Sequence, residues 1–283
     1  MATMNMNNEL FCNQHFRVVD QLTSDKSVLV VCFANAASIG FHGVDFGQKF
    51  LSKIGLSGIF IHSAEADWFQ HESIFEAVSI VREVSKSFDQ TVLLGDSMGA
   101  YIALDVSQYW PADHVITFGP VSNINPDLPP FETRFLDHFS NVKNCRSITS
   151  LAAKKYSLVY DPCDFDQRHV MALDLPDDRT HHYRIYGGSH RPQIILRDIG
   201  VLSEFTSSLI RNGHVTSELF SHARSAKRDS EYYWISLFRR NLKNRPAVAK
   251  LAVDRLEAMG ALPRRLPLLR RKVERRLLET SDA

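Results

Sequence analysis

The stretch that decides the fold is Thr91–Tyr101, which reads TVLLGDSMGAY. An apolar run precedes Gly95 and an amphipathic helical pattern begins at Met98, so Ser97 falls on a turn between a strand and a helix. Gly95 and Gly99 lack side chains, which leaves room for a turn so tight that the serine backbone is strained. The positive end of the following helix stabilises nearby negative charge. This context predicts a nucleophilic Ser97; the simpler alternative is a serine that only caps a helix.

Short apolar runs on either side of this stretch alternate with longer helical patterns. An uninterrupted apolar run is typical of a strand that helices cover on both faces, so the alternation predicts βαβ units and a mostly parallel sheet. A long closing helix is expected over 192–212, and the irregular, proline-containing stretch 119–150 is a candidate lid. The expected core strands are 27–33, 58–62, 91–94, 114–118, 156–160 and 182–186, with 16–20 as a candidate early antiparallel strand.

Charge divides the chain of 283 residues into two parts, although the formal net charge is only +1. Residues 213–283 contain 16 Lys/Arg and 8 Asp/Glu, whereas residues 1–212 have an acidic excess. We therefore expect an α/β domain over 1–212 and a basic, all-helical appendix over 213–283. The appendix is a candidate contact for a protein partner, an acidic polymer or a membrane surface, or simply a solvated face. No groove-reading motif predicts specific nucleic-acid binding.

Several classes of protein are disfavoured by what the sequence lacks. The four cysteines form no C-x-x-C pair, which suits reduced thiols better than a disulfide framework. No charged N-terminal stretch leads into an apolar run, and no segment has the roughly 20 apolar residues of a membrane span, so the expected location is the cytoplasm. Neither a nucleotide-binding fingerprint nor a metal-ligand spacing is present, so no cofactor and no metal are predicted.

A nucleophilic serine needs a base, and His190 is the best-placed candidate. It follows Gly187-Gly188-Ser189, directly after the last expected strand and before a helix. Glycines there allow the loop to bend so that the imidazole reaches the serine. The alternative for His190 is a surface loop histidine. His181 and His182 precede that strand at the opposite edge and are expected to be exposed or structural.

The acid that orients the histidine is expected after the preceding strand, where the sequence reads DPCDFD over 161–166. Asp164 is favoured, because it lies a few residues past the strand, where the loop has turned back toward the histidine. Asp161 is the second choice, since it could instead cap the turn around Pro162. Asp166 could equally cap the helix that follows. All three aspartates remain open at this point.

Two backbone N–H groups are needed to stabilise the negative charge that develops on a carbonyl oxygen during acyl transfer. Met98, directly after the serine, is expected to supply one. The loop after the first core strand, with its small side chains, is expected to supply the other, through Ala34 or Asn35.

The motif GDSMG, the acidic loop DPCDFD and the terminal GGSH, in that order, resemble the α/β-hydrolase superfamily over about residues 27–212. The resemblance implies an eight-stranded, mostly parallel sheet with a Ser-His-Asp triad on loops at its carboxyl edge. It also implies a small-molecule or glycan acyl ester as substrate, with carboxylic ester hydrolysis as the first expectation. Two alternatives are a catalytically silent scaffold whose helical appendix binds a partner, and an acyltransferase that acts on a sugar.

Overall fold

Apolar side chains alternate between the two faces of the central strand β3 (Val28–Phe33). Leu29, Val31 and Phe33 pack into one hydrophobic cluster, and Val28, Val30 and Cys32 pack into a second one. Because successive side chains of a strand point to opposite faces, an entirely apolar strand requires a covering layer on each side. The computed structural model describes residues 8–41, 46–125, 127, 131–140, 142 and 145–281, and it provides both layers.

The described strands form one eight-stranded sheet in the order β1-β2-β4-β3-β5-β6-β7-β8. Strands β1 and β2 pair antiparallel, β2 also pairs antiparallel with β4, and the remaining neighbours are parallel. The expected mostly parallel α/β sheet is therefore confirmed, and the expected early strand is β2. The strands other than β3 are β1 (Asn8–Cys12), β2 (Phe16–Gln21), β4 (Ser57–Ser63), β5 (Gln90–Asp96), β6 (His114–Phe118), β7 (Tyr156–Tyr160) and β8 (Thr180–Arg184).

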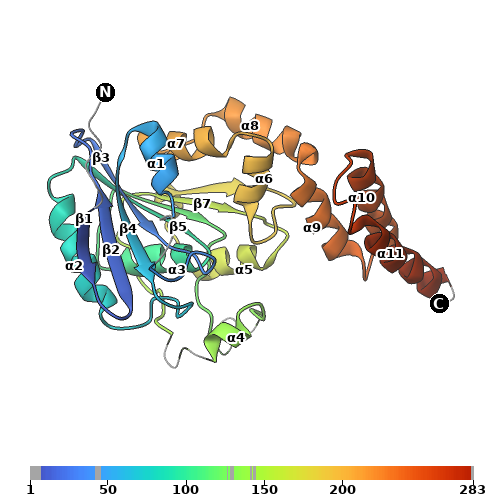
Figure 1. Cartoon of the computed structure of the whole chain (residues 1–283), viewed down its shortest axis with the longest axis horizontal. Coiled ribbons are helices and arrows are strands. Elements are labelled where there is room, and N and C mark those ends of the chain that lie inside the picture. The colour runs from blue at the N-terminus through green and yellow to red at the C-terminus, as the bar shows by residue number, and fades with distance from the viewer. Residues whose placement is uncertain are drawn as a thin grey trace.

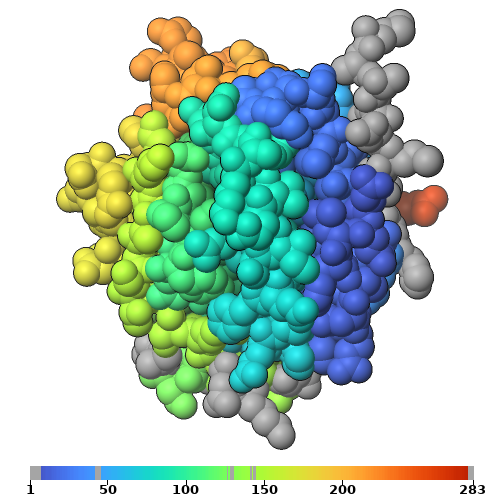
Figure 2. Space-filling model, turned by 90° about the vertical axis from the view of Figure 1, so that its left-hand side faces the viewer, coloured from blue at the N-terminus to red at the C-terminus, as the bar shows by residue number. Residues whose placement is uncertain are grey.

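Helices cover both faces of the sheet (Figure 1). The first cluster contains residues of α2 (Ile74–Ser85) and α3 (Met98–Val106). Figure 2 shows α2, in teal, beside the blue N-terminal strands. The second cluster draws its helical residues from α1 (Gln48–Ile54), α6 (Pro192–Asp198), α7 (Leu202–Asn212) and α8 (Ser217–Ala226).

The prediction of a single closing helix over 192–212 is wrong, because this segment forms two helices, α6 and α7. The break lies at Gly200, whose φ of +79° leaves the right-handed helical region. Glycine adopts such a conformation at little cost, so the helical pattern of side chains continues across the break while the backbone changes direction.

The last helices of the chain lie apart from the sheet (Figure 1), and their apolar side chains form a separate small core. This core contains Trp234 and Phe238 of α9 (Glu231–Asn241), Val253 of α10 (Pro246–Ala258) and Val273 of α11 (Leu266–Ser281). In contrast, Ala223 of α8 is buried in the second cluster of the sheet domain. Helix α8 thus packs with the sheet although it follows the expected boundary at 212/213; the division into two domains remains a prediction. None of the described helices combines the length and the apolarity that crossing a membrane requires.

Candidate active site

Ser97 lies on the sharp turn between β5 and α3, at φ 55° and ψ −113°. A Cβ atom on Gly95 would lie 2.0 Å from the carbonyl oxygen of Gly99, and one on Gly99 would lie 2.3 Å from the carbonyl oxygen of Phe33. Both positions therefore exclude every residue except glycine. The Ser97 N–H donates to the Phe118 carbonyl at 2.9 Å, which anchors the strained residue to the next strand. The serine is half-buried.

His190 follows β8 on a loop and points back at the serine. Its Nε2 lies 2.8 Å from Ser97 Oγ. Ser189, the preceding residue, has a φ of +47°, a left-handed conformation that lets the chain reverse before α6. The structure thus brings together the two side chains that the sequence nominated, 93 residues apart in the chain.

The carboxylate beside His190 belongs to Asp166, so the preference for Asp164 is corrected. Asp166 Oδ1 lies 2.9 Å from His190 Nδ1, and its side chain is fully buried near the start of α5 (Phe165–Ala172). Asp164 instead accepts the Phe165 N–H at 2.7 Å as the cap of α5, and it accepts the Ser189 hydroxyl at 2.5 Å. The helix begins between the two aspartates, and its first turn directs Asp166 inward.

Asp161, the second choice, does not contact the imidazole either. Its buried carboxylate accepts the backbone N–H groups of Cys163, Gly187 and Ser189 at 2.9, 3.0 and 2.9 Å. These bonds tie the loop after β7 to the loop that carries His190. Asp161 therefore supports the site without being placed to orient the histidine directly.

Arg134 is a functional candidate that sequence reasoning missed. Its Nη1 donates to Asp166 Oδ1 at 2.9 Å, and its guanidinium also contacts both carboxylate oxygens of the buried Glu132. Both residues lie in the irregular stretch between β6 and β7, where no periodicity marks them. Burial raises the pKa of Asp166, but the nearby charges and hydrogen bonds of His190 and Arg134 outweigh it and hold that pKa below its usual value.

The hydrogen-bond chain continues from Arg134 into the core. Glu132 Oε2 lies 2.7 Å from His169 Nε2, and His169 Nδ1 accepts the Ser122 backbone N–H at 3.2 Å. Because Nδ1 is an acceptor, we assign the proton of a neutral His169 to Nε2, where it is donated to Glu132. Burial raises the pKa of Glu132, but the hydrogen bonds from His169 and Arg134 outweigh it and lower that pKa to about 2.

Aromatic rings pack against the imidazole from the same irregular stretch. The Phe135 ring meets His190 edge-on, with ring centroids 5.5 Å apart, and Trp68 meets Phe135 at 4.8 Å. Phe135 immediately precedes the short helix α4 (Leu136–Phe139). The described part of the stretch that was a candidate lid therefore contacts the catalytic candidates directly through Arg134 and Phe135.

Of the candidate oxyanion donors, Ala34 is excluded because its N–H donates to the Ile61 carbonyl at 3.0 Å and continues the sheet. The backbone N–H groups of Met98 and Asn35 have no hydrogen-bond acceptor among the described residues. The Asn35 side chain donates to Asp96 Oδ2 at 2.9 Å and so holds its loop against the turn that carries Ser97. Met98 and Asn35 remain the candidates. No group of three or more potential ligands is placed to bind a metal within the described ranges.

Comparison with known proteins identifies the fold. An esterase of Pyrococcus furiosus, Pf2001, superposes with a TM-score of 0.51 at 12% identity, over 73% of this chain and 90% of the esterase. The glycosylation-associated protein complex Gap123 of Streptococcus agalactiae gives 0.51 at 14% identity, over 70% of this chain and 45% of the other. A search against family models and a search of curated proteins each found no match. The chain has the α/β-hydrolase fold.

Proposed function

We propose that this chain, which has the α/β-hydrolase fold, is a serine hydrolase that cleaves a carboxylic ester through Ser97, His190 and Asp166. The observation that carries the proposal is the continuous contact from Ser97 Oγ to His190 Nε2 and from His190 Nδ1 to Asp166. Both distances are within hydrogen-bonding range, and the serine lies on a strained turn as a nucleophile in this fold requires.

In the proposed reaction, the Ser97 hydroxyl attacks the ester carbonyl carbon while its proton moves to His190 Nε2. Asp166 accepts the Nδ1 proton in a hydrogen bond, which sets the tautomer of the imidazole and stabilises its charged form. The N–H groups of Met98 and Asn35 stabilise the oxyanion. His190 then protonates the departing alcohol, an acyl-enzyme remains, and a water molecule that His190 deprotonates releases the acid.

The choice of an ester rests on fold analogy, to which the esterase from Pyrococcus furiosus contributes only its fold. Acyl transfer to a sugar uses the same first half-reaction and differs only in the acceptor. A catalytically silent scaffold is the alternative from another class. Product analysis with added sugar acceptors tests acyl transfer, and the labelling experiment that follows tests the silent scaffold.

The decisive experiment is labelling of the folded protein with a fluorophosphonate probe, which reacts with activated serines. We expect stoichiometric labelling of the native chain and none of Ser97→Ala. The matched control is Ser87→Ala, an exposed serine on the protein surface, which should label like the native chain. Circular dichroism verifies that each variant is folded. If the native protein, folded, takes up no probe, the silent scaffold replaces the enzyme.

A further inference from the structure

The loop that carries His190 is contacted by the C-terminal helices as well as by the sheet domain. A Cβ atom on Gly187 would lie 2.4 Å from the ring of Tyr233, so this α9 side chain packs directly on the glycine backbone. Lys227, just before α9, places its Nζ 5.3 Å from the ring centroid of Tyr186. The appendix therefore covers the outer side of the loop immediately before His190.

The most direct of these contacts is made by Arg240 at the end of α9. Its Nη2 lies 2.5 Å from Asp161 Oδ2, the oxygen that also accepts the N–H groups of Gly187 and Ser189. The same nitrogen lies 3.8 Å from Asp164, whose carboxylate holds the Ser189 hydroxyl. One guanidinium thus neutralises both carboxylates that hold the loop.

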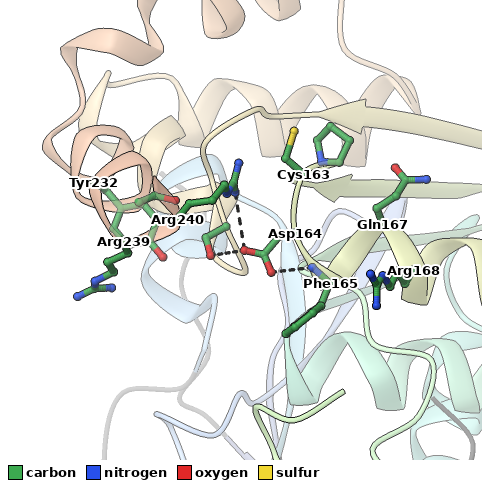
Figure 3. A pocket seen from close by; sticks show the side chains of 11 residues that line it. Cys163, Asp164, Phe165, Gln167, Arg168, Tyr232, Arg239 and Arg240 are labelled. Atoms are coloured by element: carbon green, nitrogen blue, oxygen red, sulfur yellow. Dashed lines mark hydrogen bonds and ion pairs between the residues drawn. The ribbon is translucent and has the colours of Figure 1, made fainter. Parts of the chain in front are cut away.

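Arg240 reaches these carboxylates along a cleft of about 550 Å³ between α9 and α5, which Asp164, Ser189 and Arg239 also line. Figure 3 shows Arg240 extending from α9 toward Asp164, with Phe165 and Arg168 on the α5 side of the cleft. A bridge across a cleft can be removed without opening a cavity in a packed core. Removing the Arg240 side chain therefore tests its effect on the position of the His190 loop rather than on the packing of a core.

We propose that Arg240 is a positioning residue, through which the appendix holds the loop of His190 in the conformation that reaches Ser97. The proposal rests on the proposed function of that histidine. Ser189 has a φ of +47°, a conformation that costs free energy and persists only where surrounding contacts impose it. Asp161 imposes it by accepting the Ser189 N–H, and its side chain is fully buried. Without Arg240, that carboxylate loses its cationic partner and the loop can relax.

The test compares Arg240→Met with Arg239→Met. Arg239 is the adjacent exposed residue of α9 and makes no ion pair with the described residues, so it is the matched control. We expect Arg240→Met to lower kcat on an ester about 10- to 100-fold with little change in KM, because a misplacement of about 1 Å has an effect of that size. Arg239→Met should keep native values, and Arg240→Lys should recover part of the loss because it restores a cation but not the planar fork.

Amide hydrogen exchange reports on the loop independently of activity. Arg240→Met should accelerate exchange of the Gly187 and Ser189 amides at least tenfold, whereas Arg239→Met should leave them unchanged. Unchanged exchange in Arg240→Met, or faster exchange with native kcat, would overturn the positioning role. If Arg240→Met fails to fold, Arg240→Lys supplies the same comparison. A native protein that takes up no fluorophosphonate contradicts the proposed function, and the exchange rates then still decide whether Arg240 holds the loop.

Discussion

Replacing Asp166 by Asn tests which carboxylate supports His190. Asp166 Oδ1 lies 2.9 Å from His190 Nδ1. Two unit charges about 4 Å apart interact by about 4 kcal/mol at an effective dielectric constant of about 20. The amide removes the carboxylate charge, so Arg134 keeps Glu132 as an ionic partner and no carboxylate among the described residues contacts the imidazolium directly. Its oxygen would still have to accept from both His190 and Arg134, so its NH2 group would occupy the buried position of Oδ2, which has no hydrogen-bond partner. We expect kcat to fall about 10³-fold at neutral pH, with a smaller change in KM.

The matched variant is Asp164→Asn, which tests the aspartate that sequence reasoning favoured. An Asn side chain retains an oxygen that can accept the Phe165 N–H, so the cap of α5 is conserved. The Asn NH2 group can donate to the Ser189 hydroxyl in place of the bond that the carboxylate accepts, and Asp161 still binds the loop N–H groups, so we expect kcat within a few-fold of the native value. Steady-state hydrolysis of a chromogenic acetate ester and the rate of fluorophosphonate labelling measure both variants. If Asp164→Asn loses three orders of magnitude while Asp166→Asn stays near native, the assignment drawn from the geometry is wrong.

Two further predictions concern stability. Gly99→Ala places a Cβ atom 2.3 Å from the Phe33 carbonyl oxygen, so urea unfolding should show a free energy of unfolding about 3 kcal/mol lower than that of the native chain. Gly200→Ala meets nothing within 4 Å, so its positive φ should lower the free energy of unfolding by only about 1 kcal/mol. Equal losses in the two variants would contradict the steric argument. Because the pKa of Glu132 in the folded protein, about 2, lies below its ordinary 4.5, the stability from its ionised form is complete above pH 4.5 and is lost as the pH falls toward 2. Glu132→Gln should therefore unfold with roughly 3 kcal/mol less free energy than the native chain at neutral pH, and this difference should vanish near pH 2; a difference independent of pH would refute the ionic contribution.

The local sequence was sufficient to predict the sheet and two residues of the candidate site, Ser97 and His190. Strands β6 and β7 begin and end at the expected residues, because each is a short segment of mostly apolar, β-branched or aromatic residues, which favour a buried strand. The turn around Ser97 is dictated by two glycines that no other residue could replace. His190 follows Gly187-Gly188-Ser189 in the loop after the last strand, so its place at the carboxyl edge of the sheet could also be predicted.

The acid could not be chosen in the same way. Asp161, Asp164 and Asp166 lie within six residues, and each has a side chain able to cap or to accept a hydrogen bond. Which of them meets His190 depends on where α5 begins and on cations from elsewhere in the chain. Arg134 comes from the irregular stretch and binds Asp166, whereas Arg240 comes from α9 and binds Asp161. Neither contact is accompanied by a periodic pattern in the sequence from which it could be predicted.

By itself, the sequence determined the parallel sheet, the strained serine and the histidine that faces it, because short-range apolar patterning and glycine sterics act within a few residues. Only the tertiary structure decided that Asp166 contacts the imidazole and that the Ala34 N–H donates to the neighbouring strand. It also decided that Arg134 of the irregular stretch pairs with Asp166 and that Arg240 of the appendix pairs with Asp161. Those outcomes depend on hydrogen bonds and charge pairs between segments that are distant along the chain, and no local preference encodes such partners.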